Sequence, residues 1–258
     1  MSLQGLFGIL DYLIYLVRST NRHGVHSPFV YHFTDRVLYG KSPCEYEAAA
    51  EMCRKRMVQS SRKVDFGSQS QHLSKLALNV IPSAKHNRLL FRWIQDQQLG
   101  KHIVEIGSSF GVTPLYLQRG PQPFSRYWVF DRQSAVLKIT DYNLREYDCN
   151  ETINQIQYQQ VDEIMEQLAA IEDGHLDMLI INESLEPDSF WRLMDWVTPK
   201  LGPNGSIVMT TLRKSESQQL LWQQLQNQKE ITVGIDLFTM GMAFARKTQV
   251  KENFILRY

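Results

Sequence analysis

Apolar and polar residues follow two different patterns along the chain, and the change falls near residue 100. Upstream, apolar side chains recur at helical spacing, which predicts helices over 3–18, 28–38, 44–58, 70–79 and 84–98. Downstream, short apolar runs predict strands over 102–106, 127–131, 153–158, 176–181 and 205–210, alternating with helices over 113–119, 134–147, 161–170, 188–199 and 215–227. This alternation predicts a mostly parallel sheet with helices on both faces.

The last part of the chain departs from this alternation. Two apolar runs, 231–238 and 242–246, are separated only by a break at Gly241. Two successive strands with no helix between them predict an antiparallel hairpin. The chain is therefore predicted to combine a helical N-terminal extension over 1–98 with an α/β domain over 99–258.

The predicted first helix carries an apolar stripe on one face. The stripe comprises Leu3, Leu6, Phe7, Leu10, Leu13, Ile14 and Val17. It is too short to span a bilayer, and the other face has almost no Lys or Arg to hold it on a membrane surface. We expect it to pack on the protein itself or on a partner subunit, so a homodimer through the N-terminal helices is plausible.

Composition narrows the function further. The 258 residues are 43% apolar and 21% charged, which is typical of a soluble globular protein. The net charge of +1 provides no electrostatic footprint for nucleic acid. Three cysteines without a C-x-x-C pair, and no secretory signal, predict a reduced cytoplasmic setting.

A glycine-containing loop follows the first predicted strand. The run reads Glu105-Ile-Gly107-Ser108-Ser109-Phe-Gly111-Val-Thr113 and leads into a predicted helix. Glycines permit close approach of backbone to a ligand, and a helix N-terminus offers unpaired N–H groups. The spacing differs from the G-x-G-x-x-G of dinucleotide-binding loops. A tight strand–helix turn without any ligand is the alternative.

This loop resembles the first motif of class I S-adenosylmethionine-dependent methyltransferases, especially the O-methyltransferase-like group. Residues 21–30, 236–244 and 251–254 are similar to a divergent bacterial branch of that family, so the resemblance covers nearly the whole chain. It implies a Rossmann-like α/β sandwich with a mostly parallel seven-stranded sheet ending in an antiparallel hairpin. It also implies S-adenosylmethionine as cofactor, a small-molecule substrate, and loop residues Glu105, Gly107, Ser108, Ser109, Gly111 and Thr113 around the methionine moiety. Glu105 would meet the ammonium group of the cofactor.

Further cofactor contacts are expected at the ends of later strands. Asp131 ends the second strand, 24 positions after Gly107, where a carboxylate can accept hydrogen bonds from ribose hydroxyls. It could instead cap the helix that starts near Ser134. Gln160 follows the third strand and would hydrogen-bond the adenine edge, or else be a polar surface residue. Asn182, after the fourth strand, is also predicted to contact the cofactor.

Two segments of the chain contain candidates for a general base. His23 and His26 precede Ser27-Pro28, a helix-start pattern, so either imidazole could serve a substrate hydroxyl or simply bond backbone in a turn. Glu183 follows Asn182 at the end of the fourth strand. We treat His26 and Glu183 as the catalytic candidates.

The chain lacks the acidic metal ligands of the metal-dependent relatives. It has Asn182-Glu183 after the fourth strand and Thr210-Thr211 after the fifth, a set that would hold Mg²⁺ poorly. The sequence therefore predicts a metal-independent methyltransferase acting on a small-molecule oxygen or nitrogen. The alternative is a catalytically degenerate protein that binds cofactor or a protein partner without turnover. A nicotinamide oxidoreductase is disfavoured by the glycine spacing and the terminal hairpin.

Overall fold

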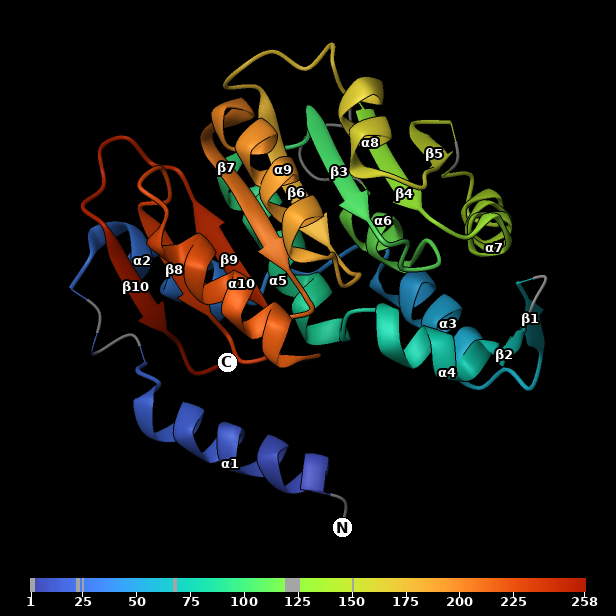
Figure 1. Cartoon of the computed structure of the whole chain (residues 1–258), viewed down its shortest axis with the longest axis horizontal. Coiled ribbons are helices and arrows are strands. Elements are labelled where there is room, and N and C mark those ends of the chain that lie inside the picture. Colours follow the sequence, from blue (N-terminus) through green and yellow to red (C-terminus); the bar gives the residue numbers. More distant parts are fainter. Residues whose placement is uncertain (1–2, 22–23, 25, 67–68, 119–125, 150) are drawn as a thin grey trace.

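The computed structural model describes residues 3–21, 24, 26–66, 69–118, 126–149 and 151–258 (Figure 1). Its helices are α1 (Leu3–Arg18), α2 (Pro28–His32), α3 (Glu47–Val58), α4 (Leu73–Val80), α5 (Ala84–Gln97), α6 (Val112–Leu117), α7 (Ser134–Arg145), α8 (Val161–Gln167), α9 (Pro187–Val197) and α10 (Glu216–Asn227), with a π-helical turn η2 (Phe33–Leu38) and a 3-10 turn η3 (Thr198–Lys200). Its strands are β1 (Lys63–Asp65), β2 (Ser70–His72), β3 (His102–Ile106), β4 (Arg126–Asp131), β5 (Ile153–Gln157), β6 (Leu176–Ile181), β7 (Leu201–Met209), β8 (Val233–Asp236), β9 (Gly241–Phe244) and β10 (Glu252–Ile255).

The main sheet has the order β10-β8-β9-β7-β6-β3-β4-β5. Strands β5, β4, β3, β6 and β7 are parallel to one another, whereas β9 runs antiparallel to both β7 and β8. The predicted mostly parallel α/β sheet and its terminal antiparallel hairpin are thus confirmed. The chain winds outward from β3 to β5 and then returns to place β6 on the other side of β3. Such a reversal opens a crevice at the carboxyl ends of β3 and β6, where α/β proteins bind ligands.

Three local predictions differ from the structure. The main sheet has eight strands, not seven, because β10 adds to β8 in parallel register. Residues 70–72, predicted as helix, instead pair with β1, so the helix begins only at Leu73. The helix predicted over 28–38 changes to π-helical hydrogen bonding at Phe33.

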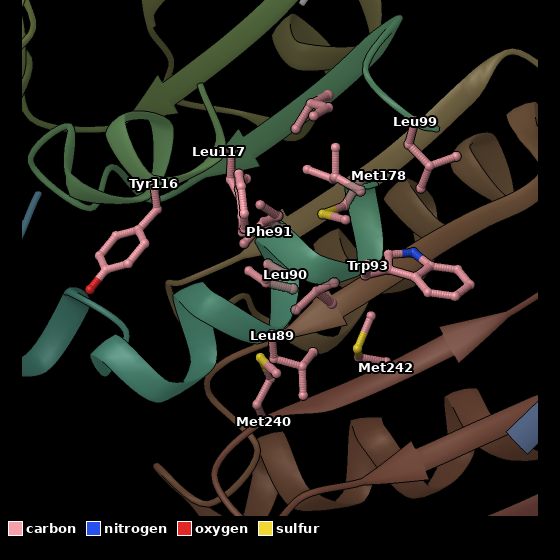
Figure 2. Packing of buried hydrophobic residues seen from close by; sticks show 14 of the residues in the cluster. Leu89, Leu90, Phe91, Trp93, Leu99, Tyr116, Leu117, Met178, Met240 and Met242 are labelled. Atoms are coloured by element: carbon pink, nitrogen blue, oxygen red, sulfur yellow. The ribbon is translucent and has the colours of Figure 1, made fainter. Parts of the chain in front are cut away.

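The core continues across the sequence position that separates the predicted extension from the α/β domain. Helix α5 is buried along most of its length, and Trp93 lies fully buried among side chains that include Phe33 and Phe244. Figure 2 shows α5 side chains beside Met178 of β6 and Met242 of β9. The N-terminal helices and the sheet therefore share one hydrophobic core.

Helices α3 and α4 lie at the end of the sheet toward which β3 points, whereas α1 stands apart below the body (Figure 1). Tyr15 anchors α1, since its hydroxyl donates to the Leu256 carbonyl oxygen at 2.5 Å. Leu13 and Val17 remain 52% and 87% exposed, so the apolar stripe is only partly covered, and the homodimer stays a prediction. Within the described ranges, no helix is both long and apolar enough to cross a bilayer.

Candidate cofactor site

The loop between β3 and α6 is a compact turn that requires glycine. Gly107 and Gly111 have φ angles of +79° and +83°, which L side chains rarely adopt. A Cβ atom at Gly107 would also lie 2.9 Å from both the backbone nitrogen and the Cβ of Glu183. The sequence predicts that Gly107 allows a ligand to approach the backbone. In the structure, the atoms that lie close to Gly107 belong to Glu183.

Glu105 is fully buried beneath the loop and braces it. Its carboxylate accepts hydrogen bonds from the Ser109 amide at 3.0 Å, the Asn182 side-chain amide at 2.8 Å and the Tyr127 hydroxyl at 2.8 Å. Burial raises the pKa of Glu105 to about 7, against the lowering effect of the Ser109 and Tyr127 hydrogen bonds. Glu105 thus shapes the loop from beneath, and a contact with a cofactor ammonium stays a prediction.

Asp131 holds the other side of the loop from the carboxyl end of β4. One carboxylate oxygen accepts from the Ser108 amide at 2.9 Å, and the other accepts from the Gln133 amide at 2.8 Å. Desolvation raises the pKa of Asp131 to about 6. A carboxylate oxygen can accept more than one hydrogen bond, so each oxygen retains acceptor capacity for a hydroxyl group.

Asn182 connects the loop to the next strands of the sheet. Its side-chain amide nitrogen donates to the Gly107 carbonyl oxygen at 3.0 Å as well as to Glu105. Its side-chain oxygen accepts from the Thr210 hydroxyl at 2.9 Å, and its backbone oxygen accepts from Lys214 Nζ at 3.0 Å. The carboxyl ends of β3, β6 and β7 are therefore joined through one buried amide.

A polar cluster that the sequence did not predict lies against Gly107. Glu183 accepts hydrogen bonds from the Tyr158 hydroxyl and from Arg132 Nε, the latter at 3.1 Å. The Arg132 guanidinium also lies 4.9 Å from the centre of the Tyr158 ring. These side chains come from the segments that follow β4, β5 and β6, so the fold alone brings them together. The only sequence signal was their shared position directly after strands.

The remaining predicted site residues divide into two groups. Ser108, Ser109, Gly111 and Thr113 are buried in the loop and its helix, where Ser109 Oγ accepts from the Thr113 amide at 3.0 Å. Gln160 is exposed and precedes α8, where its backbone nitrogen donates to Glu163 at 3.0 Å. This exposure favours the alternative that Gln160 is a polar surface residue.

His26 is not brought to this site. It is exposed beside Ser27, whose hydroxyl accepts from Gln249 at 2.8 Å near the start of β10, at the opposite edge of the sheet from the glycine loop. The described contacts do not connect His26 to the glycine loop, and its role as the base stays a prediction. His23 lies outside the described residues.

The donor set at the strand ends offers little to a divalent cation. Among the described residues, no group of three or more His, Cys, Asp or Glu side chains is placed to hold a metal ion. Glu183, the carboxylate nearest to the end of β6 in the sequence, already receives two donors, and the ammonium of Lys214 lies at the neighbouring Asn182. Such a set does not fit a Mg²⁺ site.

Replacing Glu105 with glutamine is expected to flatten the pH dependence of stability. The native protein keeps the Glu105 proton up to about pH 7, whereas the unfolded chain loses it near the usual value of 4.5. Between these pH values the native state binds more protons, so the free energy of unfolding falls as pH rises, by up to ~1.4 kcal/mol per pH unit. Urea unfolding at pH 5 and pH 7.5 measures this fall in the free energy of unfolding. We expect the fall to be smaller in Glu105→Gln than in the wild type by roughly 2 kcal/mol. Parallel pH profiles for the two proteins would contradict the assignment.

Comparison with known proteins supports the fold at the level of architecture. No family model matches the chain, and no curated protein matches its sequence. Among solved structures, the chain is similar to the S-adenosylhomocysteine-bound methyltransferase PaMTH1 of Podospora anserina, with a TM-score of 0.57, 11% identity, and coverage of 80% of this chain and 89% of that one. It is also similar to the O-methyltransferase TomG of Streptomyces achromogenes in complex with S-adenosylmethionine, with a TM-score of 0.56, 15% identity, and coverage of 84% and 95%. For an S-adenosylhomocysteine complex of a Bacillus cereus O-methyltransferase the TM-score is 0.55, at 12% identity and coverage of 80% and 92%.

These similarities confirm the predicted fold. The chain has the Rossmann-like α/β fold of class I S-adenosylmethionine-dependent methyltransferases, with O-methyltransferases among its structural neighbours. The glycine loop, Asp131 and Asn182 lie at the carboxyl ends of β3, β4 and β6, where this fold class opens its crevice.

Proposed function

We propose that this protein is a metal-independent methyltransferase that uses S-adenosylmethionine to methylate an oxygen or nitrogen of a small molecule. The observation that carries the proposal is the loop of residues 107–111, bound on one side by Glu105 and on the other by Asp131. The cofactor supplies an electrophilic methyl group, and transfer depends mainly on holding the acceptor in line with it.

Asp131 is the residue best suited to hold the ribose. It is the carboxylate at the carboxyl end of β4, it is only 8% exposed, and both of its oxygens keep acceptor capacity. With a pKa raised to about 6, it is ionised at neutral pH and would accept hydrogen bonds from the two ribose hydroxyls.

The ion pair beside Gly107 would control access to the loop. Arg132 and Glu183 have side chains 39% and 19% exposed, so the pair is only partly shielded from water. Surface ion pairs of this kind contribute about 0–1 kcal/mol, which a bound ligand can replace. If a ligand displaced Arg132 from this pair, the carboxylate of Glu183 would be free to act as the base toward an acceptor hydroxyl or amine.

Binding and turnover can be tested in sequence. Isothermal calorimetry with S-adenosylmethionine, S-adenosylhomocysteine and NAD is expected to show binding of the two adenosyl sulfur compounds and none of NAD. Incubation with radiolabelled S-adenosylmethionine and a panel of small phenols, carboxylic acids and amines, in the presence of EDTA, then measures methyl transfer without metal.

Each outcome of these measurements separates the candidate functions. Binding with methyl transfer in EDTA supports the proposal, whereas transfer that requires added Mg²⁺ contradicts its metal independence. Binding of S-adenosylhomocysteine with no transfer to any acceptor favours the catalytically degenerate alternative. Binding of NAD alone would overturn the assignment of the cofactor.

A further inference from the structure

A pocket of about 430 Å³ lies on the other side of Asn182 from the glycine loop. Its walls come from α3, from the connection between α4 and α5, and from the segment that follows β7. Asn182 links the two places, because it donates to the Gly107 carbonyl oxygen at 3.0 Å and accepts from Lys214 of the pocket, also at 3.0 Å. A molecule in the pocket would therefore lie beside the proposed cofactor site.

The pocket is lined by basic side chains and, among the described residues, by no Asp or Glu. Two of its three cations have carboxylate partners, since Arg54 pairs with Glu51 and Arg213 pairs with Asp236. Lys214 has neither an Asp nor a Glu oxygen within 4.0 Å in the described part of the chain, and donates only to the Asn182 carbonyl oxygen. Its ammonium therefore makes no direct ion pair there. Burial lowers its pKa, and the carboxylate of Glu183 opposes this from beyond ion-pair distance.

A second unused donor lies on the same segment. The terminal nitrogens of Arg213 contact the two oxygens of Asp236 at 3.1 and 3.0 Å, but its Nε is buried with no hydrogen-bond partner. Buried donors in folded proteins nearly always find an acceptor. Arg213 lines this pocket and also a second hollow beside Asp236, so its guanidinium would have to shift before an acceptor in the pocket could reach Nε.

The rest of the pocket is mostly apolar. Val58, Val80, Ile81 and Pro82 contribute hydrocarbon walls. His86 adds a polar group without charge at neutral pH, because burial lowers the pKa of its imidazole to about 4. An apolar chamber with one charged end is suited to a ligand that has an apolar body and one anionic group.

We propose that this pocket is the acceptor subsite and binds a small organic carboxylate, with its apolar body against the α4–α5 connection and its carboxylate on Lys214 Nζ. Binding of the anion is argued from the pocket alone, whereas its role as methyl acceptor rests on the function proposed above. Charge-assisted hydrogen bonds are about twice as strong as neutral ones, so the carboxylate should dominate selectivity.

The test is a matched pair of probes applied to the full chain without cofactor. Calorimetry is expected to show that 1-naphthoate binds at least 10-fold more tightly than 1-naphthamide, which has the same body and no charge. Lys214→Met should weaken naphthoate at least 10-fold and leave naphthamide unchanged. Lys75→Met removes an equal charge from an exposed position on α4 and should change neither. Thermal melting of both variants checks that the fold is retained.

Three outcomes would overturn the proposal: equal affinity for the two probes, an unchanged naphthoate affinity in Lys214→Met, or an equal loss in Lys75→Met. Addition of S-adenosylhomocysteine then distinguishes the two proposals. If naphthoate binds through Lys214 but S-adenosylhomocysteine does not bind at all, the anion pocket stands and the proposed cofactor function fails. If naphthoate and S-adenosylhomocysteine exclude each other, the pocket is not an acceptor subsite.

Discussion

Replacement of Asp131 by asparagine is expected to weaken binding of S-adenosylhomocysteine about 100-fold. The substitution removes the charge that two ribose hydroxyls would meet, and loss of two charge-assisted hydrogen bonds corresponds to roughly this factor. In the wild type, the backbone amides of Ser108 and Gln133 donate to the Asp131 carboxylate. The asparagine side chain would instead place its NH₂ group, itself a donor, against one of these amides. Calorimetry at pH 8, where the carboxylate is ionised, measures the effect.

A pH series supplies independent support. Because the pKa of Asp131 is raised to about 6, protonation below that pH should weaken binding in the wild type and leave the already weak asparagine variant unchanged. Asp141→Asn, which removes a half-exposed carboxylate paired with Arg145 on α7, is the matched control and should bind normally. Wild-type affinity in Asp131→Asn would remove Asp131 from the cofactor site.

Truncation of Trp93 to alanine is expected to cost about 4 kcal/mol of unfolding free energy, the usual range for a buried Trp or Phe. Trp93 is fully buried and lies 5.2 Å from Phe244 and 5.6 Å from Phe33, measured between ring centres. It therefore joins α5, η2 and β9 in one cluster. Urea unfolding followed by far-ultraviolet circular dichroism measures the loss.

The companion variant Trp93→Phe sharpens this expectation. The Nε1 of Trp93 is buried without a partner, so phenylalanine removes volume and an unsatisfied donor together and should cost much less than alanine. Both variants should unfold in a single transition, because the helices before residue 98 and the sheet share this core. Two separate transitions in Trp93→Ala would show that the two parts fold independently.

The periodicity of the chain predicted the order of the central elements well. Four of the five parallel strands, β3, β4, β6 and β7, are largely apolar because both of their faces are covered, and buried parallel strands lose the alternation of half-exposed ones. The edge strand β5 is more polar and partly exposed. Asp131 was located correctly at a strand end by the same pattern. Periodicity did not predict β10 (Glu252–Ile255), a short and partly exposed edge strand in which only Phe254 and Ile255 are apolar.

The sequence identified several residues of the candidate site but not how they lie relative to one another. Glu105, Gly107 and Asp131 stood out because an acid and a glycine at a strand end have few structural roles. The Arg132–Glu183–Tyr158 cluster did not, because its members come from three strand–helix connections that only the fold brings together. Lys214 was missed for a related reason: a basic residue four positions after Thr210 has no periodic signature, and its place in the pocket beside Asn182 is visible only in three dimensions.

The joining of the two ends of the chain has a consequence for biosynthesis. Thr20 pairs with Leu256, its carbonyl oxygen accepts from the Arg257 amide at 2.9 Å, and Tyr15 bonds the Leu256 carbonyl oxygen. Contacts across more than 230 residues of sequence are costly in loop entropy and form late. The rings of Tyr12 and Tyr15 also pack on Phe238. During translation, α1 therefore lacks these contacts and keeps its apolar side exposed until residues 238–257 have left the exit tunnel.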